Sequence, residues 1–443
     1  MKNQISIQEF CNWIDNYLNF EKTPQKDIFW LETMNFFCQK MNHPENKTKC
    51  FHVAGSKGKG SVSVMIAGIL EEMNKSCGIY TSPHLIDFRE RIATLNGFLS
   101  DEIYSKSAEE LINCVDSVKD EELPGNRRIT WFELVTLYSF LCFKNAGFDY
   151  SVYEVGLGGR LDSTNVVKPE CSVINTIELE HTEFLGDTVE KIAFEKGGII
   201  KENVPVVIAG QSESVKQVFR NIAAEKHSPI LFADEKGSVE NIFYKDERMC
   251  FTLKAEGLKR PLSVKLKLLG KVQAQNALLA VLAVKQVFPD VDESILEKGL
   301  ENAVLSGRFE ILKANENHGK IILDGAHTFN SVKYSIETLK AIYPDEKFNL
   351  LFGCAKDKKV EEISSLFVND FNGIYLTKPG TVKQSDLLRM ENAFSEQNLK
   401  FHSSEDFVSE IRKSVEESKN QNKILLVTGS FYLVTEVKKL LNQ

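Results

Sequence analysis

Apolar runs of strand length alternate with longer amphipathic or apolar stretches along most of this chain. The pattern predicts a strand just before Gly55 and further strands in the first part of the chain at residues 150–155, 172–176 and 204–209. It predicts helices at residues 7–20, 28–41, 62–70 and 274–287. A second alternation predicts strands at residues 320–323, 349–352, 373–377 and 424–427. Because such alternation is typical of parallel sheets with helices on both faces, we expect an α/β protein.

The break between the two alternations predicts two domains, residues 1–303 and residues 304–443. In the first domain, residues 248–254 and 262–268 indicate an antiparallel excursion at the edge of the domain. Residues 82–100 read as a loop that is long for a compact domain, and loops of that length are commonly functional.

The first candidate for chemistry is a glycine-spaced loop that leaves an apolar strand and opens an apolar-periodic stretch. Its residues are Gly55, Ser56, Lys57, Gly58, Lys59, Gly60 and Ser61. Glycines let backbone N–H groups converge on one point, and a helix adds its positive N-terminal end, so the pattern predicts a site for nucleotide phosphates. Lys59 is expected to meet the outer phosphates, and Ser61 to offer its hydroxyl to Mg²⁺. The alternative is a glycine-rich turn with an exposed lysine, because Gly60 separates Lys59 from Ser61 and the spacing departs from the usual motif.

A second glycine-rich turn, residues 156–159, follows an apolar strand that ends on Glu154. At the carboxyl end of a strand beside a phosphate loop, this carboxylate is predicted to bind magnesium; the alternative is a strand-end acid in water. His181 follows the next strand by a few residues, where an imidazole could ligate a second metal or be a polar loop residue. For Lys196 the plain alternative is an ion pair with Glu195 or a neighbour.

Composition narrows the class of protein. With 443 residues, 42% of them hydrophobic, the chain is long enough for a full core. The formal net charge of -8 argues against general affinity for nucleic acid or anionic membranes. Nine cysteines without a Cys-x-x-Cys pair indicate neither a disulfide framework nor a zinc site. The N-terminus lacks a signal-peptide core and no run is apolar enough to enter a membrane, so we expect a cytoplasmic protein.

Taken together, these motifs resemble the folylpolyglutamate synthase/dihydrofolate synthase branch of the Mur ligase superfamily. The resemblance is carried by residues 52–61, 80–85, 90–92, 130–133, 154–165, 180–186, 192–201, 307–310, 324–327, 352–358 and 428–434. It covers nearly the whole chain, in the order and spacing of that family. It implies the Mur ligase architecture, with an N-terminal P-loop ATPase-like parallel-sheet domain and a smaller C-terminal Rossmann-like α/β domain.

The activity that the resemblance implies is ATP-dependent addition of L-glutamate to a reduced folate such as tetrahydrofolate. A carboxylate is a poor electrophile, so ATP first converts it to an acyl phosphate, which the glutamate amine then attacks. By similarity the loop holds the phosphates, Ser61 and Glu154 bind one Mg²⁺, and His181 binds a second. The implied catalytic residues are Lys59, Lys196 and His181. The likeness suggests a monomer whose partners are small molecules, and it leaves open whether dihydropteroate is also a substrate.

Other site residues follow from the same resemblance. Lys196 matches a family lysine that is carbamylated, which turns a cation into an anion able to bind or position magnesium. The positions that match family contacts to the nucleotide are Gln273, Asn276, Arg308, Asp324 and His327. The positions that match the folate side are Ser82, Pro83, His84, Leu85, Arg89 and Arg91. For each residue of that second set the alternative is a structured surface loop.

Some positions depart from the family pattern. Val272 stands at a frequent histidine position, and Thr328 and Phe329 replace the usual Asn-Pro pair, which leaves the contacts to adenine and glutamate open.

Two other classes of protein remain as alternatives. A sister Mur ligase of peptidoglycan precursor synthesis is not expected to carry the motif at residues 82–85, and a non-catalytic P-loop switch would bind nucleotide without forming a product.

Overall fold

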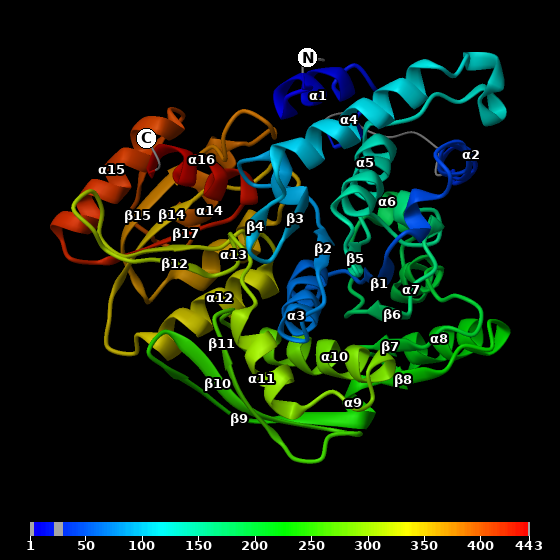
Figure 1. Ribbon diagram of the computed structural model, residues 1–443. Coiled ribbons are helices and arrows are strands. Elements are labelled where there is room, and N and C mark those ends of the chain that lie inside the picture. Colours follow the sequence, from blue (N-terminus) through cyan, green and yellow to red (C-terminus); the bar gives the residue numbers. More distant parts are fainter. Residues whose placement is uncertain (1–3, 22–29, 442–443) are drawn as a thin grey trace.

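The computed structural model describes residues 4–21 and 30–441. Figure 1 shows two parts side by side, the blue-to-green N-terminal part on the right and the yellow-to-red C-terminal part on the left. Each part is built on a largely parallel sheet, and a small antiparallel sheet lies at the bottom of this view. The predicted α/β class is confirmed. No helix in these residues is both long and apolar enough to cross a membrane.

The N-terminal sheet has the strand order β4-β3-β2-β5-β1-β6-β7-β8, and β3 alone runs opposite to the other strands, so that its pairings with β2 and β4 are antiparallel. The strands are β1 (Lys49–Ala54), β2 (Cys77–Tyr80), β3 (Ile92–Thr94), β4 (Gly97–Phe98), β5 (Tyr150–Glu154), β6 (Cys171–Ile174), β7 (Val206–Ile208) and β8 (Ile230–Phe232). β1 is buried from its second residue onward, as expected when helices cover both faces of a parallel sheet.

Helices cover both faces of this sheet. They are α1 (Ile7–Ile14), α2 (Glu32–Lys40), α3 (Lys59–Glu72), α4 (Asp101–Asp116), α5 (Trp131–Ala146), α6 (Thr182–Leu185), α7 (Val189–Gly197), α8 (Glu213–Glu225), α9 (Ala233–Lys236), α10 (Lys271–Val287) and α11 (Glu293–Asn302). Phe51 and Val53 of β1 pack with α3 and α10, while Cys50 and Ala54 belong to the cores under α5 and under α7 and α8. One strand serves both faces because successive side chains point in opposite directions.

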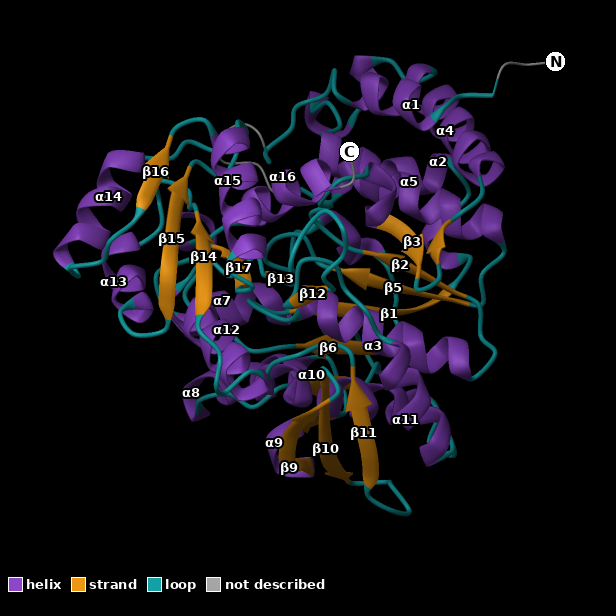
Figure 2. Ribbon diagram, turned by 90° about the vertical axis from the view of Figure 1, so that its left-hand side faces the viewer, coloured by secondary structure: helices purple, strands orange, loops and turns teal. Residues whose placement is uncertain are grey.

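The C-terminal sheet has the order β12-β13-β17-β14-β15-β16. Its strands are β12 (Glu310–Leu312), β13 (Ile321–Leu323), β14 (Phe348–Phe352), β15 (Phe371–Thr377), β16 (His402–Ser404) and β17 (Ile424–Thr428). Its helices are α12 (Phe329–Ile342), α13 (Val360–Ser364), α14 (Leu387–Glu396), α15 (Phe407–Asn420) and α16 (Phe431–Leu441). In Figure 2, α13 and α14 lie on one side of these strands and α15 and α16 on the other.

The antiparallel sheet consists of β9 (Gly237–Lys245), β10 (Arg248–Ala255) and β11 (Leu262–Leu266). The predicted excursion is therefore confirmed, but it contains one strand more than predicted. β9 has no buried residue, and its alternation of half-buried and exposed positions is interrupted at Glu240 and Asn241, which weakens the pattern in the sequence. The sheet packs against α10 and α11 of the N-terminal part and against α12 of the C-terminal part.

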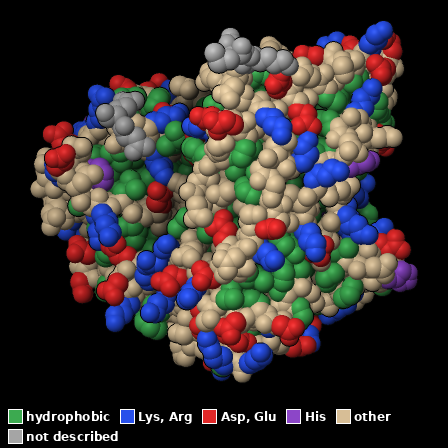
Figure 3. All heavy atoms as spheres, in the orientation of Figure 1, with side chains coloured by type: hydrophobic (Ala, Val, Ile, Leu, Met, Phe, Trp, Pro, Cys, Tyr) green, Lys and Arg blue, Asp and Glu red, His purple; other side chains and the backbone are tan. Residues whose placement is uncertain are grey.

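The turn between β9 and β10 also joins the two parts through side chains. Glu247 of this turn accepts hydrogen bonds from Lys320 Nζ at 2.6 Å and from the Tyr343 hydroxyl at 2.7 Å. The Lys320 ammonium lies 4.6 Å from the centre of the Tyr343 ring. Elsewhere, basic and acidic side chains are interspersed over the face shown in Figure 3.

Three predicted segments differ from the structure. The helix expected at residues 7–20 ends at Ile14, because Leu18, which extended the apolar pattern, is 56% exposed and joins no core. The helix expected at residues 28–41 is α2, whose bounds are narrower, and residues 28 and 29 lie outside the described residues. The loop expected at residues 82–100 contains the 3₁₀-helix η2 (Phe88–Arg91) followed by β3 and β4.

The helix that carries Lys59 is fixed by a close crossing with α11. A Cβ on Gly68 of α3 would collide with the carbonyl oxygen of Gly299 on α11, and a Cβ on Gly299 would collide with the backbone of Ile69. Backbone therefore touches backbone at this crossing, with no flexible side chain to give way.

We expect Gly68→Ala to lower the free energy of unfolding by about 1–3 kcal/mol, because the new methyl group overpacks a rigid helix crossing. Chemical denaturation followed by circular dichroism measures this change. Gly319→Ala is the matched control, because its Cβ would meet atoms at 3.4 Å, an ordinary contact, and we expect a change within about 0.5 kcal/mol. Equal effects of the two substitutions would contradict the crossing as the cause.

Candidate active site

The candidate site lies where three parallel strands of the N-terminal sheet end. β1 runs between β5 and β6, with Val53 level with Glu154 and Ala54 level with Ile174. The segments that follow these three strands therefore meet at one edge of the sheet, which is where parallel sheets usually bind ligands.

The loop of residues 55–61 turns from β1 into α3. Gly55 has a φ of 139° and Gly58 a φ of 74°, a backbone region that favours glycine. The loop also lies close to Asn175, since a Cβ on Gly55 would be 2.7 Å from Asn175 Cβ. No side chain caps the start of α3, so its first N–H groups remain available to an anion. These features fit the predicted phosphate site.

Two ammonium groups converge on one carbonyl oxygen of this loop. Lys59 Nζ donates to Gly55 O at 3.0 Å, and Lys196 Nζ donates to the same atom at 2.9 Å. Lys196 is 1% exposed and also donates to Glu180 Oε1 at 2.9 Å. Burial and the charge of Lys59 lower the pKa of Lys196 to about 8, against the opposing effect of Glu180. About half of the Lys196 side chains are therefore neutral near pH 8.

Glu180 is the acidic partner that the sequence analysis missed at this point. Its carboxylate lies 4.0 Å from Lys57 Nζ in addition to its contact with Lys196. The alternative pairing of Lys196 with Glu195 is wrong, because Glu195 pairs with Arg160 at 2.9 Å. The only signal for Glu180 in the sequence was its position directly before His181.

His181 lies at the rim of the same cluster. It is exposed and begins α6 with a φ of 46°. Loss of hydration lowers the pKa of His181, Glu180 opposes this shift, and the charges of Lys196 and Lys59 add to it. A neutral imidazole at this place is free to ligate a metal, so the predicted role remains compatible with the geometry.

Glu154 ends β5 and is 6% exposed. Its carboxylate lies against the first turn of α3, because a Cβ on Gly60 would be 3.5 Å from Oε2, and this oxygen accepts a hydrogen bond from Ser82 N at 3.2 Å. Burial raises the pKa of the Glu154 carboxyl, while Lys59 opposes the shift. The buried Ser61 follows Gly60 in the same turn, so a carboxylate and a hydroxyl lie at the start of α3.

These oxygen groups fit Mg²⁺ that is bound together with a nucleotide. Among the residues that the structure describes, no three histidine, cysteine, aspartate or glutamate side chains gather into a metal site. Mg²⁺ usually takes one or two carboxylates together with substrate phosphates and waters, so a complete protein cage is not required. The placement of Glu154 and Ser61 is compatible with their predicted role as the protein's ligands in such a site.

The C-terminal part reaches this edge through Arg308. Loss of hydration lowers the pKa of Arg308, while Asp324 and Glu154 oppose the shift, so its charge lies within reach of carboxylates from both parts. Loss of hydration and the charge of Lys57 lower the pKa of His327 to about 4. The structure thus brings the three predicted C-terminal residues to the edge that carries the loop.

Two further predicted residues lie at the start of α10. Gln273 and Asn276 are buried, and their amides are hydrogen-bonded to each other at 2.9 Å. The Asn276 amide also lies beside Gly58, where a Cβ would be 2.8 Å from Asn276 Oδ1. Both residues therefore lie beside the loop, as predicted for nucleotide contacts.

The segment of residues 82–85 links this site to the C-terminal part. Glu90, which the sequence analysis placed in the motif of residues 90–92 without assigning it a role, accepts hydrogen bonds from the N–H of Leu85 at 2.7 Å and of the next two residues at 3.0 Å each. The segment begins at Ser82, which donates to Glu154, and Leu85 packs against the core under α16. The segment therefore touches both the carboxylate at the end of β5 and the C-terminal core.

The basic residues predicted for the folate side already have partners. Arg89 pairs with Asp87 at 2.7 Å, and Arg91, which is 1% exposed, pairs with Glu21 at 2.8 Å. Arg91 Nε also donates to His84 Nδ1 at 2.7 Å. Neither guanidinium is free to meet a substrate carboxylate in this state, so their role in folate binding stays a prediction.

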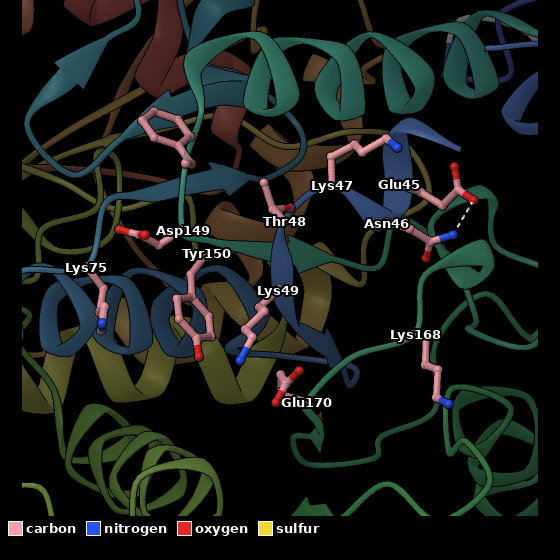
Figure 4. A pocket seen from close by; sticks show the side chains of 11 residues that line it. Glu45, Asn46, Lys47, Thr48, Lys49, Lys75, Asp149, Tyr150, Lys168 and Glu170 are labelled. Carbon is pink, nitrogen blue, oxygen red and sulfur yellow. Dashed lines mark hydrogen bonds between the residues drawn. The ribbon is translucent and has the colours of Figure 1, made fainter. Parts of the chain in front are cut away.

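A hollow of about 530 Å³ lies at the opposite ends of β1 and β5 (Figure 4). It is lined by Glu45, Asn46, Lys47, Thr48, Lys49, Lys75, Phe148, Asp149, Tyr150, Lys168 and Glu170. Figure 4 shows that Lys47, Lys75 and Lys168 point to different sides. Their charges do not converge on one point, in contrast to those of Lys59 and Lys196 at Gly55 O.

Comparison with known proteins agrees with this geometry. The family model "Mur ligase middle domain" matches residues 53–284, and "Mur ligase, glutamate ligase domain" matches residues 307–431. The chain is 31% identical to a dihydrofolate synthase/folylpolyglutamate synthase of Bacillus subtilis, over 98% of this chain and 99% of that protein. It is 32% identical to a protein of the same name from Haemophilus influenzae, over 87% of each chain.

Solved structures show the same architecture. A folylpolyglutamate synthase from Thermotoga maritima superposes with a TM-score of 0.82 at 30% identity, covering 98% of this chain and 96% of that one. A folylpolyglutamate synthase of Mycobacterium tuberculosis complexed with ADP superposes with a TM-score of 0.87 at 24% identity, covering 98% of each chain. The second likeness concerns the fold alone.

We expect Glu154→Gln to abolish the Mg²⁺-dependent part of ATP binding, because an amide is a much weaker magnesium ligand than a carboxylate. Titration calorimetry with ATP, in Mg²⁺ and in EDTA, measures this part. The thermal unfolding temperature should be unchanged or higher, since the substitution removes a buried charge. Glu195→Gln, which alters the surface pair with Arg160, is the matched control. If Glu154→Gln retained the full effect of Mg²⁺, the metal assignment would be wrong.

Proposed function

The chain belongs to the Mur ligase family, in its folylpolyglutamate synthase/dihydrofolate synthase branch, and we propose that it joins L-glutamate to tetrahydrofolate while converting ATP to ADP and phosphate. It is an ATP-dependent ligase that makes an amide from a carboxylate and an amine. The observation that carries the proposal is that a phosphate loop, a buried carboxylate and a lysine of lowered pKa meet at one sheet edge. An arginine of the C-terminal part reaches the same edge.

The loop and its lysines bind the triphosphate. The N–H groups at the start of α3 donate to phosphate oxygens, and Lys59 exchanges its contact with Gly55 O for an outer phosphate. Ser61 and Glu154 would hold one Mg²⁺ and His181 a second, and bound Mg²⁺ would supply positive charge to the phosphate oxygens. Arg308 adds a cation from the C-terminal side.

The reaction proceeds in two displacements. The folate carboxylate attacks the γ-phosphate of ATP, which forms an acyl phosphate and releases ADP. The glutamate amine then attacks the acyl carbon, and the tetrahedral intermediate expels phosphate and loses a proton. Both steps develop negative charge on oxygen, so fixed cations such as Lys59 and Arg308 supply most of the protein's contribution.

We further propose that Lys196 is carbamylated. Only a neutral amine attacks CO₂, and burial already lowers the pKa of this lysine to about 8. The carbamate is an anion, so its contact with Glu180 becomes repulsive, and the ammonium groups of Lys57 and Lys59 supply compensating charge. The carbamate adds an oxygen-bearing group beside the loop to those of Ser61 and Glu154, and it is suited to orient magnesium.

For the oligomeric state, the cellular compartment and the domain boundary we keep the sequence-based expectations as proposals. We propose a monomer working in the cytoplasm, and none of the nine cysteines, all of which the structure describes, is in a disulfide. We place the domain boundary at residue 304, in the segment between α11 and β12. The folate is proposed to lie along residues 82–91, between the two parts.

The function is tested by ADP release from MgATP and tetrahydrofolate, with and without L-glutamate. We expect turnover that requires L-glutamate and a product heavier by one glutamate residue in mass spectrometry. Dihydropteroate in place of tetrahydrofolate is the second arm, because the similar proteins of Bacillus subtilis and Haemophilus influenzae are named for both activities. Lys59→Ala should reduce turnover at least a hundredfold. No ADP release with either acceptor would favour a sister Mur ligase, and ATP binding without any product would favour a non-catalytic nucleotide switch.

The carbamate gives a pH-dependent prediction. The neutral share of Lys196 rises from about a tenth at pH 7 to about half at pH 8, so carbamylation in a fixed concentration of CO₂ should rise across this window. A ¹³C NMR spectrum with labelled bicarbonate should show a carbamate signal that Lys196→Met abolishes. Lys201→Met is the control, since burial also lowers the pKa of Lys201 to about 8 but it lies outside the site. A signal that survives Lys196→Met would refute the assignment.

A further inference from the structure

Three buried amides form a chain beside the phosphate loop. Asn175, at the end of β6, donates from Nδ2 to Asn276 Oδ1 at 2.7 Å. Asn276 donates from Nδ2 to Gln273 Oε1 at 2.9 Å. All three side chains are buried, and Asn175 is 3% exposed. The chain therefore connects the end of a central strand with the first turns of α10.

The direction of this chain is set by the backbone at one end. Thr176 N donates to Asn175 Oδ1 at 2.8 Å, and a backbone N–H is always a donor, so the Asn175 oxygen must face it. Asn175 then offers Nδ2 to Asn276, which must accept with Oδ1 and donate with Nδ2. Gln273 must accept in turn, and its own amide nitrogen is left over.

That remaining donor is not satisfied by the protein. No residue in the described ranges 4–21 and 30–441 accepts a hydrogen bond from Gln273 Nε2, and this nitrogen is absent from the buried unpartnered atoms, so it is open to a ligand. The same chain touches the loop, because a Cβ on Gly58 would be 2.8 Å from Asn276 Oδ1 and would collide with the Asn175 amide.

We propose that Asn175 is a positioning residue that fixes the direction of this amide chain, so that Gln273 presents only a hydrogen-bond donor to the bound nucleotide. The ligand group that it selects is an acceptor on the base or the ribose. This inference rests on the proposed function only insofar as the chain binds ATP.

Substitution of Asn175 by aspartate should reverse the chain. The new carboxylate still accepts from Thr176 N but has no proton for Asn276, which must rotate its amide and donate instead. Gln273 must then donate to Asn276, and its oxygen faces the ligand. Gln273→Glu produces the same outward acceptor by a separate route that leaves Asn175 intact.

The experiment measures ATP dissociation constants by titration calorimetry, without folate or glutamate, so that failure of ligation does not affect it. We expect Asn175→Asp and Gln273→Glu each to weaken ATP binding about ten- to hundredfold. In turnover the KM for ATP should rise by a similar factor with kcat within about twofold, because the contact is made in ground state and transition state alike.

An added carboxylate also repels phosphates, so the decisive comparison uses ATP analogues that each lack one acceptor. These are 1-deaza-, 3-deaza- and 7-deaza-ATP and 2′- and 3′-deoxy-ATP. One of them should bind the unsubstituted protein about tenfold more weakly than ATP does, and this ratio should fall to about one in both variants.

Asn349→Asp is the matched control. Asn349 is a buried amide of β14 that accepts from Gly373 N at 3.0 Å and donates to Ser418 at 3.0 Å, so it carries the same change far from the loop. It should lower the unfolding temperature without altering the ATP-to-analogue ratios. Ratios that stay the same in Asn175→Asp and Gln273→Glu as in the unsubstituted protein would overturn the proposal.

Discussion

The carbonyl oxygen of Gly55 accepts hydrogen bonds from two ammonium groups, those of Lys59 and Lys196, and the site is arranged around this contact. Burial lowers the pKa of Lys196, and the repulsion from Lys59, which is strong where water is excluded, lowers it further. Glu180 offsets part of the excess charge. An anion at the loop would complement the remainder, so the proposed phosphate binding would relieve a repulsion that the protein already contains. Burial and this repulsion together favour the neutral form of Lys196, which is the form able to react with CO₂.

Such a contact requires that segments far apart in the sequence be held within tenths of an ångström. The order β5-β1-β6 places the ends of three strands together, and each contributes one part: Glu154 from β5, the loop from β1, and Asn175 from β6. The glycine crossing of α3 and α11 fixes the helix that carries Lys59. The antiparallel sheet contacts both parts, and Glu247 binds Lys320 and Tyr343, so the approach of Arg308 is constrained by contacts on a different sheet. Catalysis depends on this precision because cations act only where charge develops.

The sequence predicted those parts of the site in which the reactive residues lie within one short stretch that also has a recognisable strand or loop pattern. The loop carries its glycines and Lys59 in one short run, and Glu154 ends an apolar strand, so both were visible in the sequence. Residues that act through partners distant in sequence gave no such signal. Glu180 owes its role to Lys196, Glu21 owes its role to Arg91, and Asn175 is an ordinary strand-end residue until α10 brings Asn276 to it. Strands β3 and β4 were not predicted for the same reason: they are short, and they form only by pairing, β3 with β2 and β4 with β3.

The two halves of the proposed site differ in how their charges are satisfied. On the proposed nucleotide side cations are in excess, whereas on the proposed folate side Arg91 already pairs with Glu21, and Arg89 with Asp87. A substrate carboxylate can therefore bind Arg91 only by displacing Glu21. Such an exchange leaves the buried guanidinium paired throughout, while Glu21, with 38% of its side chain exposed, is readily hydrated when released. The exchange of one carboxylate for another is then nearly neutral in electrostatic energy, and the apolar contacts of the folate must supply most of its affinity. We therefore expect charge to drive nucleotide binding, and on the proposed folate side to determine the orientation of the substrate more than its affinity.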